Sequence, residues 1–87
     1  MKYYYTYVLL SLKDHELYIS WTNDLKERIS KHNKGLVEST KSRQPFKLVY
    51  FEACLSKQSA ILREKQLKTG FGRLYLKRKI RVGSSVG

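Results

Sequence analysis

The strongest constraint on the fold is an unbroken run of aromatic, β-branched and aliphatic residues close to the N-terminus. Residues 3–10 are Tyr-Tyr-Tyr-Thr-Tyr-Val-Leu-Leu, and such residues favour the pleated backbone of a β-strand. The polar residues 13–16 predict a turn, and residues 17–21, Leu-Tyr-Ile-Ser-Trp, predict a second strand. Two strands joined by a short polar turn predict an antiparallel hairpin, in which Tyr18 and Ser20 share one face.

The rest of the chain predicts helices and one more strand. The expected elements are a helix capped by Thr22 or Asn23 and running to about His32, a strand over residues 46–53, a helix capped by Ser56 over residues 57–69, and a short basic helix or extended arm over residues 73–80. The order ββα-β-α predicts the α/β class, with a small three-stranded antiparallel sheet flanked by helices. Residues 1–82 are expected to form a single domain, and residues 83–87 a disordered tail.

The balance of charge is strongly basic and uneven. The 87 residues include 18 Lys and Arg against 7 Asp and Glu, a net charge of +11. Residues 1–35 carry six basic and four acidic side chains, whereas residues 36–87 carry twelve and three, so the net charge rises from +2 to +9. A basic surface neutralises phosphates and releases counterions, which makes nucleic acid the expected partner. Charge alone also fits a ribosomal-type protein or a merely soluble basic one.

The single cysteine, Cys54, excludes an intrachain disulfide and suits a reducing compartment. No apolar run approaches the roughly 20 residues that a membrane span needs, and the N-terminus has no signal-peptide core. We therefore expect a cytoplasmic protein with no membrane partner. The sequence leaves the oligomeric state open, including a homodimer or another protein partner.

One carboxylate in the predicted second helix is unusual. Ala60, Glu64 and Leu67 fall on one stripe, because 3.6 residues per turn bring them nearly into register. Glu64 is also the only acid after residue 53, in a stretch rich in Lys and Arg. A carboxylate on an apolar stripe needs a cation or hydrogen-bond donors. Two explanations remain open: a salt bridge to a neighbouring Arg or Lys, which is the commoner fate, or a divalent metal ion that anchors a phosphate.

Four other polar side chains have both an ordinary and a functional interpretation. Arg28 and His32 lie at i and i+4 of the first helix and project together; Arg can clamp phosphate oxygens, and His can move a proton near neutral pH. Taken singly, Arg28 fits a solvated helix residue, and His32 fits a C-terminal residue that suits the helix dipole. Tyr7 and Tyr18, on adjacent strands, fit ordinary packing in a sheet. Only their joint spacing with Glu64 points to catalysis.

Five polar positions, spaced as in a known family, carry a resemblance. They are Tyr7, Tyr18 eleven residues later, Arg28 ten further on, His32 four beyond that, and Glu64 on a later helix. With them the chain resembles the GIY-YIG nucleases, in particular the small stand-alone bacterial members, which are UPF0213-like and related to the N-terminal nuclease domain of UvrC. The flanking sequence is similar as well, over residues 17–25, 31–33, 43–50 and 63–68. The resemblance runs from about Tyr4 to Ile80.

The resemblance implies an activity and a role for each of the five residues. By analogy, Glu64 and water molecules hold one Mg²⁺ or Mn²⁺ ion at the scissile phosphate, and Tyr7 is the general base for the attacking water. A phenol needs nearby positive charge for that role, which Arg28 and the metal would supply. Arg28 also stabilises the transition state, Tyr18 positions water or phosphate, and His32 supports proton movement with Tyr7. The implied function is a metal-dependent DNA endonuclease, acting in repair or DNA processing without a covalent enzyme intermediate.

Two signature triplets depart from the pattern that gives the family its name. Tyr5-Thr6-Tyr7 replaces Gly-Ile-Tyr, and Tyr18-Ile19-Ser20 carries Ser in place of Gly. Because Ser20 shares a face with Tyr18, its side chain can crowd the phosphate site. A catalytically silent nucleic-acid-binding module of the same fold is therefore the main alternative. A structural basic protein without any site is the second.

Basic side chains outside the five are expected to grip the backbone of the nucleic acid. They are Lys41, Arg43, Arg63, Arg73, Lys77, Arg78 and Lys79. Such contacts position a nucleic acid without reading its sequence. Nothing in the chain resembles a base-reading element, so nonspecific or structure-specific cutting is expected. For any one of these residues, a solvated surface charge is an equally good interpretation.

Overall fold

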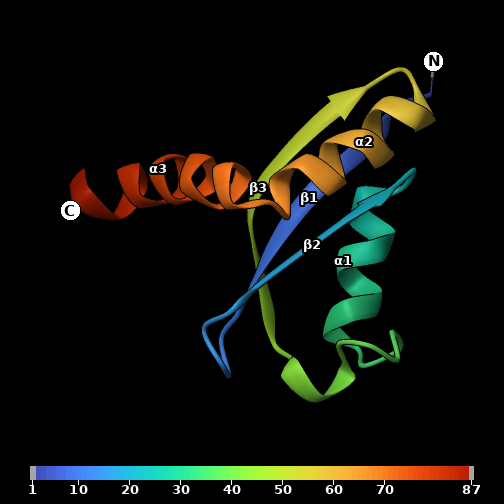
Figure 1. Cartoon of the computed structure of the whole chain (residues 1–87). Helices are drawn as coiled ribbons and strands as arrows, with labels where there is room; N and C mark the ends of the chain where they lie inside the picture. Colours follow the sequence, from blue (N-terminus) through green and yellow to red (C-terminus); the bar gives the residue numbers. More distant parts are fainter. Residues whose placement is uncertain (1, 87) are drawn as a thin grey trace.

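The structure, a computed structural model, describes the backbone of residues 2–86 and the side chains of residues 2–80. Its elements surround one sheet (Figure 1). They are β1 (Tyr4–Ser11), β2 (Leu17–Thr22), α1 (Leu25–Asn33), the short 3₁₀ helix η1 (Lys41–Arg43), β3 (Phe46–Cys54), α2 (Lys57–Leu67) and α3 (Gly70–Val86). This arrangement confirms the predicted α/β class, with a three-stranded antiparallel sheet flanked by helices.

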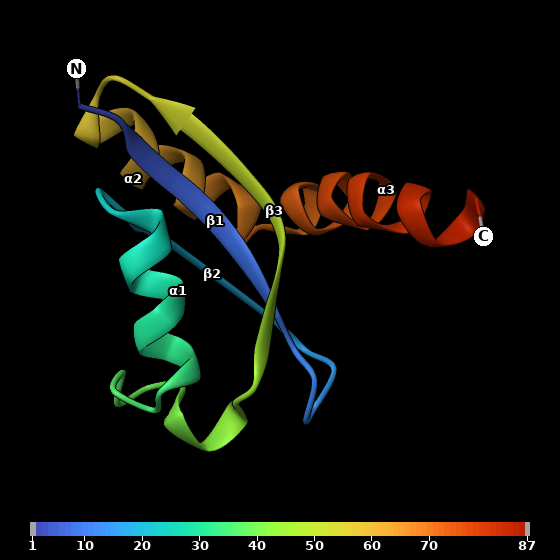
Figure 2. The same cartoon turned by 180° about the vertical axis from the view of Figure 1, so that it is seen from behind.

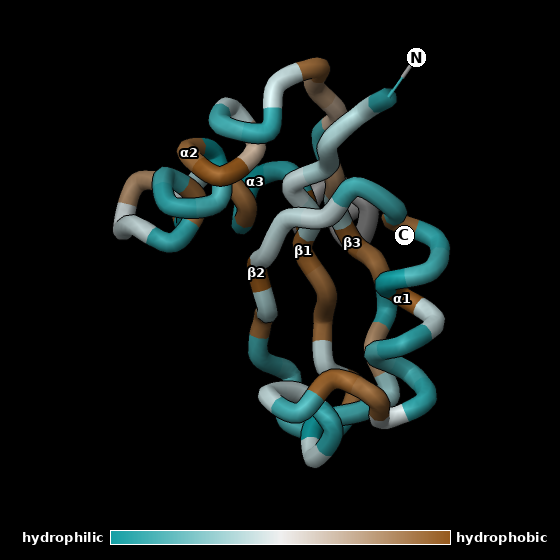
Figure 3. The backbone as a smooth tube through the Cα atoms, turned by 90° about the vertical axis from the view of Figure 1, so that its right-hand side faces the viewer, coloured by the Kyte–Doolittle hydropathy of each residue, from teal (hydrophilic) through white to brown (hydrophobic). Residues whose placement is uncertain are grey.

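The sheet has the order β2-β1-β3, so β1 is central and β2 and β3 are the edge strands. Tyr7 lies opposite Ser20, and Leu9 lies opposite Tyr18, in the register of β1 and β2. Because side chains alternate along a strand, these four residues point to the same face. Figure 3 shows the apolar stretches of β1 and β3 running through the middle of the molecule. The register therefore places Ser20 beside Tyr7 on the face that also carries Tyr18.

Each face of the sheet has its own hydrophobic cluster. On the face covered by α1, the cluster is Tyr7, Leu9 and Phe46, with Tyr18, Leu25, Ile29 and Leu48 packed against it. On the other face, covered by α2 and α3, the cluster is Val8, Leu67 and Leu76, with Ile19, Val49, Tyr50 and Ile80 around it. Figure 2 shows α1 and α2 on opposite sides of the sheet. Removing these side chains from water is the main source of stability.

The first helix begins later than predicted. Asp24 is the N-cap of α1, not Thr22 or Asn23, and its carboxylate accepts a hydrogen bond from the Glu27 N–H at 3.1 Å. The Thr22 hydroxyl instead accepts from the Asp24 N–H at 3.2 Å, so it closes the turn before the helix. All three residue types favour the cap, and the direction of the chain as it leaves β2 decides between them.

The C-terminal segment differs more from the prediction. α2 ends at Leu67 rather than residue 69. Residues 73–80, expected to form a short basic helix or an extended arm, are helical and form the middle of the longer helix α3. Gly72 permits the close packing of the two helices, because a Cβ atom there would lie 2.3 Å from the Gln66 carbonyl oxygen. α3 then extends away from the sheet (Figures 1 and 2). The backbone of α3 continues to Val86, and the side chains from residue 81 on lie outside the described part of the chain. The disordered tail expected over residues 83–87 therefore stays a prediction.

Candidate active site

A buried phenol and a buried imidazole meet between β1 and α1. The Tyr7 hydroxyl lies 2.9 Å from Nε2 of His32, and the two residues are 1% and 0% exposed. Nδ1 of His32 lies 2.7 Å from the Thr40 hydroxyl, which donates to the Val37 carbonyl at 3.5 Å. The Thr40 oxygen therefore accepts the Nδ1 proton, and Nε2 is left to accept the proton of Tyr7. These bonds form one chain from the sheet, through the helix, to the following loop.

Burial sets the protonation state of this pair. Desolvation raises the pKa of Tyr7 to about 12, although the Ser20 side chain and Arg28 act to lower it, and Glu64 raises it further. Burial lowers the pKa of His32, and the charge of Arg28 lowers it again. At neutral pH, Tyr7 is therefore a neutral phenol and His32 a neutral imidazole. Arg28 lowers the pKa of Tyr7, as expected, but the increase caused by burial is larger.

Aromatic rings surround the imidazole. The ring centroid of Tyr18 lies 5.1 Å from that of His32, and the centroid of Phe46 lies 5.8 Å away, both in edge-on contact. Tyr18 itself is only half-buried, so its ring reaches from this cluster to the surface. The structure thus brings Tyr7, Tyr18 and His32 together, as their spacing indicates.

Arg28 lines a hollow of about 280 Å³ next to these rings. The other residues of the hollow are Ser20, Trp21, Thr22 and Asn23. Among the side chains of residues 2–80, Arg28 forms no ion pair, while its charge affects both Tyr7 and His32. Its planar guanidinium is therefore free to bind phosphate oxygens in the hollow. Ser20, which replaces the signature glycine, lies in the same hollow.

Glu64 approaches from α2 and is paired with a lysine. It shares its stripe of the helix with the fully buried Ala60 and Leu67, as predicted. Its Oε2 accepts a hydrogen bond from Nζ of Lys68 at 2.6 Å, and the Glu64 side chain remains 17% exposed. The same carboxylate contributes to the raised pKa of Tyr7, so it lies within electrostatic reach of the phenol. The ion pair occupies Glu64 without sealing it from solvent.

The predicted nucleic-acid-binding residues fall into different surroundings. Two of them serve the fold: Arg43 donates to Asp14 at 2.7 Å, and Arg63 pairs with Glu52 at 2.9 Å. The hydrogen bond from Arg43 lowers the pKa of Asp14 to about 2. A guanidinium held in this way has fewer donors left for phosphate. The contacts predicted between these two arginines and the nucleic-acid backbone therefore compete with internal ion pairs.

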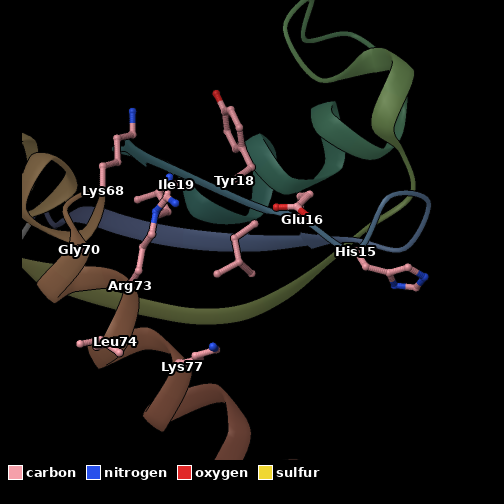
Figure 4. A pocket seen from close by; sticks show the side chains of 10 residues that line it. His15, Glu16, Tyr18, Ile19, Lys68, Gly70, Arg73, Leu74 and Lys77 are labelled. Atoms are coloured by element: carbon pink, nitrogen blue, oxygen red, sulfur yellow. The ribbon is translucent and has the colours of Figure 1, made fainter.

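The remaining predicted cations lie at the surface. Lys41 pairs with Glu38 at 3.1 Å. Arg78 and Lys79 are exposed on α3. Arg73 and Lys77, also on α3, line a groove of about 830 Å³ between that helix and β2 (Figure 4). Arg73 and Lys77 thus lie with other side chains around a concave surface.

Two side chains of the site, Thr40 and Lys68, were not named from the sequence, although a salt bridge from Glu64 to a neighbouring Arg or Lys was one of the two explanations given for that carboxylate. Thr40 lies in the segment between α1 and β3, and no local pattern in the sequence links it to His32. Lys68 follows Glu64 by four positions, which is the usual spacing of a helical ion pair. That spacing was an available signal for Lys68, whereas Thr40 required the three-dimensional path of the loop.

The comparison with known proteins shows the family of the chain. The sequence matches the family model of the GIY-YIG catalytic domain over residues 3–79. The chain belongs to the GIY-YIG family, and this membership gives it a nuclease-like fold.

Within that family its relatives are UPF0213 proteins. It is 46% identical to one from Clostridium perfringens over 65 residues, which is 74% of this chain and 69% of the relative. It is 40% identical to one from Staphylococcus haemolyticus over 70 residues, which is 79% of this chain and 84% of the relative. The solution NMR structure of a UPF0213 protein from Bacillus halodurans, 34% identical, is similar with a TM-score of 0.52 and covers 85% of this chain and 81% of its own. Within the described residues, no helix is both long and apolar enough to span a membrane.

Proposed function

We propose that this protein is an endonuclease that hydrolyses phosphodiester bonds of DNA with the help of one divalent metal ion. The observation that supports the proposal most is the buried hydrogen bond between Tyr7 and the neutral His32, with Arg28 and Glu64 close enough to act on Tyr7. A neutral imidazole that is hydrogen-bonded to a phenol can accept a proton from it. A sheet with a purely structural role does not need such a proton acceptor. We also propose that the protein acts in DNA repair or DNA processing.

The pair can take a proton from water without forming a free phenolate. The attacking water gives a proton to the Tyr7 oxygen as the Tyr7 hydroxyl proton passes to Nε2 of His32. The new oxygen–phosphorus bond forms while the bond to the leaving oxygen breaks, and solvent protonates that oxygen. The raised pKa of Tyr7 is then no obstacle, because the phenol stays neutral before and after the step.

The other residues act on the phosphate. Arg28 has no carboxylate partner among the described side chains, so its guanidinium would bind the non-bridging oxygens and stabilise their extra charge in the transition state. Tyr18, half-buried beside His32, would position the attacking water or the phosphate. Ser20 lies opposite Tyr7 and lowers the pKa of that phenol, so it would tune the proton acceptor rather than simply crowd the site.

The residues present fit a metal ion only in part. No group of three or more His, Cys, Asp or Glu side chains in the described chain could hold one. Mg²⁺ is, however, commonly bound by one or two carboxylates together with substrate phosphates and water. The partly exposed carboxylate of Glu64 fits that role when the phosphate supplies further ligands. When bound there, the ion would offset charge on the phosphate and polarise water.

A cleavage assay tests this function. Covalently closed single-stranded, duplex and branched DNA would be incubated with the protein in EDTA, Mg²⁺ or Mn²⁺. Closed circles report endonucleolytic cutting because they have no ends. We expect cutting only with a divalent ion, and a loss of at least about a hundredfold in Glu64→Gln with binding retained. Glu38→Gln, which removes an equally charged but 86% exposed carboxylate, should cut like the wild type.

The same assay decides between the proposal and its main alternative. If the protein binds DNA but cuts none of these substrates with either ion, it is a silent binding module with the nuclease fold. If it neither binds nor cuts, the basic surface serves another purpose and the site has no phosphate to act on.

A further inference from the structure

We propose that the groove between β2 and α3 binds a single-stranded stretch of nucleic acid that continues from the cleavage site. Figure 4 shows this groove, with α3 passing beside β2 and the side chains of Lys68 and Arg73 extending toward the strand. Its volume of about 830 Å³ is about three times that of the hollow at Arg28. The inference rests on the proposed function, since it names the form of substrate that the same site would receive.

The cations of the groove are placed to follow one strand. Arg73 and Lys77 are one helical turn apart on α3, about 6 Å along its axis, so they can contact successive phosphates. In the part of the chain with described side chains, neither forms an ion pair. Glu16 is the single carboxylate lining the groove, and it lies far from Lys68 in Figure 4. A phosphate backbone is therefore expected on the side of α3.

The apolar side chains of the groove favour a single strand over a duplex. Leu17 and Leu74 both line it and are 37% and 61% exposed. A duplex turns its base faces inward and offers only phosphates and groove edges outside, so it would leave these leucines in water. An unpaired strand offers base faces to apolar and aromatic side chains between its phosphate contacts. The unpaired cations and exposed leucines of the groove therefore suit a single strand better than a duplex.

Two side chains that line the groove also contact residues of the candidate active site. Tyr18 lines the groove and also contacts His32, at 5.1 Å between ring centroids. Lys68 lines the groove and binds Glu64 at 2.6 Å. Because β2 is an edge strand, no further strand of the sheet lies between the two concave surfaces. A strand bound at Arg28 can thus pass the edge of β2 and enter the groove.

Internal contacts fix the helix that forms the far wall. Leu76 is fully buried in the cluster with Val8 and Leu67. The hydroxyl of Tyr75 lies 3.0 Å from that of Tyr50 on β3. These contacts hold the first turns of α3 at a set distance from β2, so the groove exists before the nucleic acid binds and the ordering cost of binding is smaller.

Binding in EDTA tests the inference apart from catalysis. The fluorescence anisotropy of a labelled oligothymidine and of a duplex of equal length would be followed on titration with wild type, with Arg73→Gln/Lys77→Gln and with Lys26→Gln/Lys47→Gln. The second pair removes the same charge from exposed lysines outside the groove. We expect the wild type to prefer the single strand, and the groove variant to lose at least about fivefold in affinity for it, against less than twofold in the control. The salt slope of the groove variant should fall by about 1.4, since each phosphate contact on a single strand contributes about 0.7.

Three results would overturn the inference. They are equal losses in the two double variants, a wild-type preference for the duplex, and tighter binding of polyglutamate than of the oligothymidine. Because the substituted side chains are exposed, melting curves of all variants should coincide, which excludes unfolding as the cause of a loss. If the protein binds single strands through the groove but never cuts them, the proposed nuclease function is wrong, and the proposed single-strand binding still holds.

Discussion

Nζ of Lys68 lies 2.6 Å from Oε2 of Glu64, one helical turn away, and this ammonium holds the single carboxylate of the candidate site. The lysine is 52% exposed and the glutamate 17% exposed, so the pair lies at the border between the site and solvent. An ammonium and a divalent ion compete for the same carboxylate oxygens. Lys68 contacts Oε2 alone, so a divalent ion that binds this oxygen must displace the lysine, and a phosphate in the neighbouring groove offers Lys68 another partner.

Replacing Lys68 by methionine should strengthen metal binding by the protein alone. A pair this exposed contributes at most about 1 kcal/mol, which corresponds to about a fivefold gain in affinity for Mn²⁺. Titration calorimetry of Lys68→Met in the absence of nucleic acid measures it. The control is Lys65→Met, which removes the same charge from an exposed neighbour on α2. Equal gains in the two variants would mean that Lys68 does not compete for Glu64.

The hydrogen bond from His32 to Thr40 should contribute to stability and to the tautomer of the imidazole. Thr40→Val keeps the shape but leaves the buried Nδ1 proton without an acceptor, at a cost of about 1–3 kcal/mol. For a domain of this size, each kcal/mol corresponds to about 4–8 °C in Tm. Thermal unfolding should also show recovery in Thr40→Ser and little change in Ser39→Ala, at the exposed neighbour. A Thr40→Val protein as stable as the wild type contradicts the assigned network.

Two glycines of the α2–α3 junction should respond very differently to alanine. A Cβ atom on Gly72 would lie 2.3–2.6 Å from backbone atoms of Gln66 and Leu67, so α3 must shift, at a cost of about 1–3 kcal/mol. A Cβ atom on Gly70 meets nothing within 4 Å. Urea unfolding should show Gly72→Ala destabilised and Gly70→Ala unchanged or slightly more stable. Similar stabilities for the two variants would show that the helix junction is looser than described.

Ionisation of Tyr7 should weaken the fold at high pH. Its pKa is 10.0 as an ordinary tyrosine and about 12 when buried in the folded protein, so the folded state keeps a proton that the unfolded chain loses. The stabilising effect is complete below pH 10.0, declines as the pH rises toward about 12, and totals about 2–3 kcal/mol.

Denaturant titrations of wild type and Tyr7→Phe at about pH 9 and about pH 11 measure this contribution. The wild type should lose about 1 kcal/mol more than Tyr7→Phe over that interval. Tyr50, whose pKa is also raised by burial, is present in both proteins and cancels in the comparison. Tyr3→Phe, at an exposed phenol, should behave as the wild type. Parallel pH profiles for wild type and Tyr7→Phe would mean that the Tyr7 phenol ionises as readily in the folded protein as in the unfolded chain.

Much of the fold follows from local patterns in the sequence. The aromatic and β-branched runs give β1 and β2 to within one residue, and the Ser56 cap starts α2 where it was predicted. Alternation along β2 also places Tyr18 and Ser20 on one face, as predicted. These features depend on neighbours in the chain, which a sequence displays directly.

Features that depend on distant contacts were not predictable in the same way. The junction at Gly72 reflects the approach of two helices, and the hydrogen bond of Thr40 reflects how a loop returns to His32. Arg43 resembles any other loop cation in the sequence, yet the turn at Asp14 holds it. The resemblance singled out five candidate residues, but the protonation state of Tyr7 depends on burial that only the packed structure reveals.

The account is tested most directly by the rate of a single turnover. Protein in excess over labelled DNA, with a divalent ion present, reports the chemical step without product release. We predict that Tyr7→Phe, which removes only the hydroxyl that joins water to His32, slows cleavage by about 10²–10⁴-fold while DNA affinity stays within about twofold. Cleavage by Tyr7→Phe within about threefold of the wild type would contradict the proposal that the Tyr7–His32 pair accepts the proton of the attacking water.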